Sequence, residues 1–203
     1  MIHSSRNLQK WKHSKLEFFS QECGGDGDCL FHVLSVAFTT LFGVPFSMQD
    51  VRKQLACSIS LETIELFLEQ VCADQKEYTL TGSTFMQPIL SDLQAEQFSK
   101  KDALALTQSI ICQSGPFFQG TDVVLEWFVH HNTLLKKFSV GFLIFNEYGP
   151  SFIQKISNHS LVSILLYNHP NQHWQLGLLQ KTNELFSVIH ENVYNELISL
   201  ENQ

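Results

Sequence analysis

Apolar residues recur at intervals of three to four positions through much of the first two thirds of the chain, which is the spacing of one face of a helix. The pattern predicts helices over residues 30–38, 48–58, 60–71, 101–112 and 122–133. Ser47 and Thr121 occupy N-cap positions, and Asp50 lies three residues after Ser47, as in a capping box. This part of the chain is therefore predicted to be mostly helical.

Short apolar segments rich in aromatic and β-branched residues dominate the rest of the chain. They predict strands over residues 140–145, 161–167, 174–179 and 186–189. Breaks between the strands are expected at Gly149-Pro150, at residues 168–172 and at Thr182-Asn183. Strands this apolar are buried on both faces and need helices packed against them. The predicted fold class is therefore α/β (or α+β), with a small central sheet flanked by helices.

One folded unit is expected, because 203 residues with 44% hydrophobic content supply one full core and are few for two. Residues 1–19 are predicted to form a polar N-terminal arm, and residues 20–190 the single domain. Residues 191–203 have the pattern of a short acidic amphipathic helix, which we expect to form a C-terminal extension.

Charge and cysteine content narrow the possible functions. A net charge of −7 without a concentrated basic face argues against nucleic-acid binding. No apolar run approaches the roughly 20 residues that span a bilayer, and the N-terminal residues have no apolar signal region. Five cysteines without C-x-x-C spacing argue against a disulfide framework or a structural zinc site. We therefore expect a protein of a reducing, cytoplasmic compartment.

One cysteine stands where a glycine-rich turn, Gly25 to Asp28, runs into an apolar helix. The N–H groups at a helix N-terminus carry partial positive charge, which favours the thiolate of Cys29. The amides of the loop, from Asp26, Gly27, Asp28 and Cys29, could also stabilise an oxyanion. Cys29 is therefore predicted to be a nucleophile.

A cysteine nucleophile needs a base, and His173 is the predicted one. It opens a strand beside an aromatic residue, Trp174, far downstream in the sequence. His169 precedes a proline in the turn and is interpreted as a loop residue, while His32 lies three positions after Cys29 on the same helical face. A cysteine and a histidine that are distant in sequence and close in the fold are typical of cysteine hydrolases.

These segments resemble the ovarian-tumour (OTU) family of cysteine proteases, which are chiefly deubiquitinases. The matching segments are Asp26-Gly27-Asp28-Cys29-Leu30-Phe31, His173-Trp174, and Gly120 to Phe128 followed by Val140 to Phe145. The resemblance implies a papain-like fold and a thiol isopeptidase that cleaves ubiquitin or polyubiquitin from lysine, without a metal or organic cofactor. It also implies that Trp174 and His32 line a channel for the ubiquitin tail.

Two alternatives follow from the same resemblance. One is a weakly active or inactive ubiquitin-binding module, and the other is a cysteine acyl transferase or protease acting on a ubiquitin-like modifier. A delivered effector would act in the cytosol of a host cell.

The group that orients His173 is the point at which the chain departs from the family. Many relatives place Asp or Asn two residues after the histidine, and here that position is Gln175. An amide oxygen can fix the tautomer of an imidazole, but it supplies no charge. Asp26 is the charged candidate from the loop before the cysteine, and Asn168 and Asn171 are amide candidates from the turn.

Overall fold

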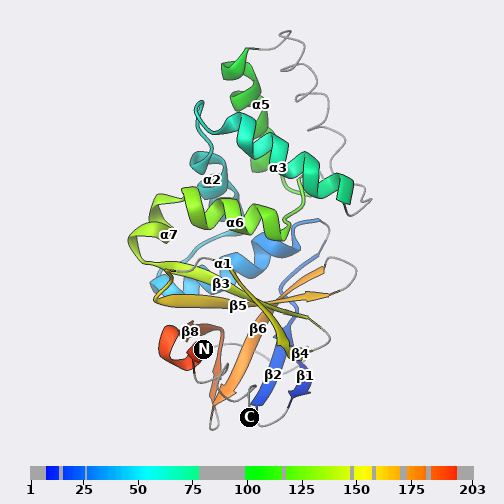
Figure 1. Ribbon diagram of the computed structural model, residues 1–203, viewed down its shortest axis with the longest axis vertical. Coiled ribbons are helices and arrows are strands. Elements are labelled where there is room, and N and C mark those ends of the chain that lie inside the picture. The colour runs from blue at the N-terminus through cyan, green and yellow to red at the C-terminus, as the bar shows by residue number, and fades with distance from the viewer. Residues whose placement is uncertain are drawn as a thin grey trace.

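The computed structural model describes residues 8–13, 16–25, 27–77, 99–115, 118–146, 149–156, 159–169, 173–181 and 184–195. In this part of the chain, an eight-stranded sheet has the order β1-β2-β6-β5-β3-β4, with β7 beside β6 and β8 beside β5. The pairs are antiparallel except for β3 and β5, which are parallel. Figure 1 shows the labelled helices gathered at one side of this sheet, with α1 next to it and α3 and α5 farthest away, while the short helical segment 191–195 lies on the other side, near β8.

The strands agree with the prediction in the centre of the sheet and differ at its edges. The strands are β1 (Leu8–His13), β2 (Leu16–Gln21), β3 (Val140–Asn146), β4 (Gly149–Ile156), β5 (Val162–His169), β6 (His173–Lys181), β7 (Glu184–Phe186) and β8 (Val188–His190). The three central predicted strands, β3, β5 and β6, are confirmed. The strand predicted over 186–189 is instead split in two at Ser187, whose carbonyl accepts a hydrogen bond from the Leu165 amide (2.8 Å).

The predicted N-terminal arm is wrong in part, because residues 8–13 and 16–21 form strands of the sheet. β2 pairs with β6, with Gln21 opposite Leu176. Phe18 and Ser20 are buried on one face of β2. The polar residues around them in the sequence make this strand hard to predict. A break was also expected at Gly149-Pro150, where β4 begins. Both errors concern strands at or next to the sheet edge, which lack the continuous apolar runs that mark the central strands.

The helices are α1 (Cys29–Phe42), α2 (Met48–Ser58), α3 (Ile64–Glu77), α5 (Lys100–Cys112), α6 (Asp122–His131) and α7 (Thr133–Lys137). The predicted capping box is present, since Ser47 and Asp50 each bond the backbone amide of the other. The helix predicted over 122–133 ends at Asn132, whose side-chain oxygen accepts from the amides of Leu134 and Leu135 (both 3.0 Å) and starts α7. Ser60 precedes α3 by a hydrogen-bonded turn with Thr63 and is not its N-cap.

Both faces of the central strands are buried, as predicted. Phe142 and Ile144 pack toward the helices, whereas Leu143 and Phe145, one position out of phase, pack in a second cluster on the opposite face. That second cluster is joined by Val193 and Tyr194 from the helical residues 191–195. The rest of the predicted C-terminal helix, 196–203, lies outside the described residues. Among the helices described, none is both long and apolar enough to cross a membrane.

Candidate active site

Cys29 is the first residue of α1, as the glycine-turn pattern predicts. The turn before it is closed by a hydrogen bond from the Asp28 amide to the Gly25 carbonyl (3.1 Å). Gly27 has a φ of 85°, which disfavours any residue with a Cβ. Buried apolar residues of α1, among them Leu30, Phe31 and Leu34, anchor the helix in the core and hold its N-terminus in place.

The start of β6 lies against the start of α1. The backbone amide of Trp174 is close enough to the Cys29 thiol to lower its pKa, so the thiol lies beside the residue that follows His173. The Gly120 carbonyl accepts from the Trp174 indole (2.7 Å), and a Cβ on Gly120 would lie only 2.0 Å from the Leu30 side chain. This close packing joins α1, β6 and the segment before α6, and it brings together a cysteine and a histidine that are distant in sequence.

The group hydrogen-bonded to His173 is Glu22, which the sequence analysis did not consider. The Glu22 Oε2 atom contacts His173 Nε2 and accepts from Gln175 Nε2 (3.2 Å). The Oε1 atom accepts from the backbone amides of Cys23 and Gly24 (both 3.1 Å). Both carboxylate oxygens are therefore acceptors, and the position of the side chain is fixed from two sides.

Register explains why Glu22 reaches His173. Gln21 is opposite Leu176, so the next residue of the chain emerges beside Gln175. His173 and Gln175 share one face of β6, because positions i and i+2 of a strand point the same way. Only the pairing of β2 with β6 reveals that Glu22 lies beside His173. The one signal in the sequence was that Glu22 is an acidic residue shortly before the cysteine turn.

The predicted partners of His173 are placed as follows. Gln175 is at the site, where it hydrogen-bonds Glu22. Asn168 lies in β5 opposite Trp174, and its buried amide oxygen has no hydrogen-bond partner in the described part of the chain. Asp26 and Asn171 lie outside the described residues. His169 pairs directly with His173 across β5 and β6, so it belongs to a strand and not to a loop.

The pKa values of Glu22 and Cys29 are shifted in opposite directions. Burial raises the pKa of Glu22, but its hydrogen bonds from His173 and the Gly24 amide outweigh this effect, and the pKa of Glu22 is lowered overall. Burial raises the pKa of Cys29, and the amides of Trp174 and Leu30 oppose this effect without cancelling it. The amides at the helix N-terminus favour the Cys29 thiolate, as expected, but desolvation is the larger effect and the pKa of Cys29 is raised overall in the free protein.

Three further predicted residues have structural contacts. Trp174 is only 2% exposed, so it is a core aromatic and not the wall of an open channel. The ring of His32 packs against the backbone of Gly24, where a Cβ would lie 2.5 Å from the ring. The carboxylate of Asp28 is buried and paired with Arg52. The neighbouring Cys23 thiol contacts the Gln21 carbonyl (3.5 Å), and burial raises the pKa of Cys23 to about 11.

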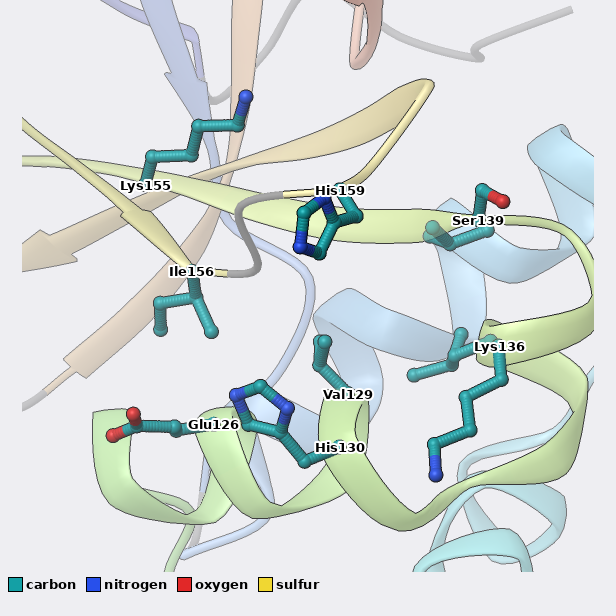
Figure 2. Close-up of a pocket in the computed structure, with 10 residues that line it drawn as sticks. Glu126, Val129, His130, Lys136, Ser139, Lys155, Ile156 and His159 are labelled. Atoms are coloured by element: carbon teal, nitrogen blue, oxygen red, sulfur yellow. The ribbon is translucent and has the colours of Figure 1, made fainter.

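A cavity of about 430 Å³ lies elsewhere, between α6, α7, β3 and the end of β4. Figure 2 shows His130 on α6 and His159, after β4, on opposite sides of it. None of the candidate site residues lines this cavity. Among the residues that the structure describes, no group of three or more His, Cys, Asp and Glu side chains is arranged to bind a metal ion.

Comparison with known proteins gave matches in structure only. No protein-family model and no curated protein sequence matches the chain. The solved structures that it resembles include OTU proteins. An OTU domain in complex with ubiquitin aligns over 98% of this chain and 94% of its own, with 14% identity and a TM-score of 0.47. An OTU deubiquitinase from Wolbachia pipientis wMel aligns over 91% of this chain and 96% of its own, with 10% identity and a TM-score of 0.45.

Proposed function

We propose that this chain is a cysteine isopeptidase that removes ubiquitin from lysine side chains, with Cys29 as nucleophile, His173 as base and Glu22 as the group that orients the base. The hydrogen bond between Glu22 and His173, one residue from the amide that contacts the Cys29 thiol, is the observation that carries this proposal. Nucleophile, base and orienting acid in this order form the arrangement that hydrolases use for acyl transfer.

The contact with Glu22 supports one tautomer of His173. An ionised carboxylate can only accept, so the ring nitrogen beside Glu22, Nε2, carries the proton. The lone pair of Nδ1 is then available to take the proton of the Cys29 thiol. Glu22 also stabilises the imidazolium that results, a task for which the neutral Gln175 is unsuited.

The reaction then proceeds in two steps. The Cys29 sulfur attacks the isopeptide carbonyl, and His173 gives its proton to the departing lysine amine. Water hydrolyses the thioester and regenerates the thiol. The Asp28 amide already donates to Gly25, so we assign the oxyanion contacts to the other amides of the turn and of the first turn of α1, including that of Cys29.

Ubiquitin is the proposed substrate on the strength of the motif resemblance around Cys29 and His173. A nucleophilic thiol must stay reduced, which favours a cytoplasmic site of action. One observation favours a second candidate, a ubiquitin-binding module with little activity: burial raises the pKa of Cys29 in the free protein. Under the first proposal, substrate binding and His173 together overcome this effect.

Labelling by ubiquitin with a C-terminal propargylamide tests the proposal. We expect the wild-type protein to form a covalent adduct, Cys29→Ala to form none, and Cys23→Ala to react as the wild type does. Binding of ubiquitin without an adduct would support the second candidate instead. Reaction with probes built on ubiquitin-like modifiers, and not with the ubiquitin probe, would refute ubiquitin as the substrate.

A further inference from the structure

Asp28 stands at the N-cap position of α1 but does not cap the helix. An aspartate at this position ordinarily accepts a hydrogen bond from the second or third amide of the helix, here that of Leu30 or Phe31. In this structure, the Asp28 side chain makes no such bond. Its Oδ1 atom accepts from Arg52, from Nε at 2.9 Å and also from Nη2, and its Oδ2 atom accepts from the Gly115 amide (2.7 Å).

Arg52 is held rigidly where it receives this carboxylate. The side chain is 0% exposed and its guanidinium lies 3.9 Å from the centre of the Phe31 ring. Its remaining donors reach the carbonyls of Ile111 (2.8 Å) and Phe118 (3.2 Å). A planar guanidinium fixed on several sides sets the direction of its carboxylate partner as well as its distance.

The amide that an Asp28 cap would occupy is in use at the active site. The backbone amides of Leu30 and Cys29 both lower the pKa of the Cys29 thiol, because their partial positive charges stabilise the thiolate. A carboxylate at the cap would compete for the Leu30 amide and would place a negative charge beside the sulfur. Both effects disfavour a thiolate and an oxyanion at this end of α1.

We propose that Arg52 is a positioning residue, which holds the Asp28 carboxylate away from the N-terminus of α1 and so reserves the first amides of the helix for the Cys29 thiolate. This inference rests on the proposed role of Cys29 as nucleophile. It explains why a buried arginine on α2 is paired with the residue immediately before the cysteine.

Site-resolved alkylation of Cys29 by iodoacetamide across a pH range tests the inference in the full chain, because it measures the thiol without ubiquitin. In Arg52→Gln, the released Asp28 carboxylate can turn to the helix. We expect the apparent pKa of Cys29 to rise by about one unit, which makes alkylation near neutral pH about tenfold slower. In the double variant Arg52→Gln/Asp28→Asn, the charge is gone, and we expect the Cys29 pKa to return to the wild-type value.

The double variant separates positioning from stability. Loss of Arg52 also leaves buried carbonyls without donors, so both variants are expected to melt below the wild type, and a purely structural role predicts equal alkylation rates in the two. Lys53→Gln, on the exposed side of the same helix, is the matched control and should match the wild type. The other ionisable groups of the segments around Cys29, namely Glu22, which acts on its pKa, and Cys23, His32 and His173, are unchanged in every variant.

Several results would overturn the inference. One is an unchanged Cys29 pKa in Arg52→Gln. Another is a Cys29 pKa that is raised in Arg52→Gln and stays raised in the double variant Arg52→Gln/Asp28→Asn. If Arg52→Gln does not fold, Arg52→Lys replaces it, and the shorter, less directional ammonium should give a smaller rise of the same sign; no rise would refute the role. If the Cys29 pKa shifts as expected in these variants but the wild-type protein does not react with the ubiquitin probe, the proposed function is refuted and this inference stands.

Discussion

Glu22→Gln is the substitution that most directly probes the proposed site, because it keeps the shape of the side chain and removes its charge. Glu22 accepts hydrogen bonds on both oxygens, two from backbone amides and two from His173 and Gln175. Glutamine has one accepting oxygen and one donating NH₂ group. In either orientation of the glutamine amide, its NH₂ group therefore faces hydrogen-bond donors, either the two backbone amides or His173 and Gln175.

The favoured orientation predicts the kinetic defect. If the glutamine oxygen stays with the two backbone amides, its NH₂ group faces His173 Nε2, which must then accept. The proton moves to Nδ1, and the ring can no longer take the thiol proton from Cys29. A charge-assisted hydrogen bond contributes about 1.5–3 kcal/mol, and the loss of about 2–3 kcal/mol in the transition state lowers kcat/KM roughly 30- to 150-fold.

Exposure limits the size of this effect. The side chains of His173 and Glu22 are 34% and 33% exposed, so water screens part of the interaction. We therefore expect less than the roughly 10⁴-fold loss seen when a fully buried triad aspartate is made neutral.

The assay is hydrolysis of a fluorogenic ubiquitin C-terminal amide, with the melting temperature measured alongside. Glu17→Gln is the matched control, since Glu17 is a carboxylate of similar exposure on β2, the strand that ends just before Glu22, and it pairs with Lys10 (2.6 Å) away from His173. Glu17→Gln should retain full activity. Wild-type kcat/KM in Glu22→Gln, or a larger loss in Gln175→Ala than in Glu22→Gln, would refute the role of Glu22.

The remaining predictions concern the surroundings of Glu22. The pKa of Glu22 is lowered from the usual 4.5, so the stabilisation that its charge contributes is present above pH 4.5 and disappears as the pH falls through the lowered value. The difference in free energy of unfolding between wild type and Glu22→Gln, measured in urea, should therefore be constant above about pH 5 and shrink below it. A difference that grows on acidification would contradict this. His173→Ala should lower kcat/KM by several orders of magnitude and His169→Ala far less, and the reverse order would make His169 the base. Gln175→Ala removes one hydrogen bond from a neutral amide to the charged Glu22 carboxylate, which water partly screens, and should cost about 1 kcal/mol, or roughly fivefold in kcat/KM, whereas a hundredfold loss would show a direct role. Gly24→Ala should destabilise the fold by about 1–3 kcal/mol, because the new Cβ lies 2.5 Å from the His32 ring, and an unchanged melting temperature would show that the ring moves freely.

The sequence by itself determined the elements whose causes are local. The capping box at Ser47 and the helical spacing of apolar residues are short-range features, and α2, α5 and most of α6 follow from them. The central strands β3, β5 and β6 were equally visible, because burial on both faces leaves a continuous apolar run. The position of Cys29 at the first residue of α1 also follows from the turn and the apolar run around it.

Only the tertiary structure decided what surrounds Cys29. The pairing of β2 with β6 brings Glu22 to His173, and no local pattern encodes a register between strands some 150 residues apart. Packing places Trp174 in the core and turns Asp28 toward Arg52, although both residues lie within motifs that suggested roles at the site. The pKa of Cys29 depends in the same way on burial, which sums contributions from several elements and opposes the local effect of the helix N-terminus.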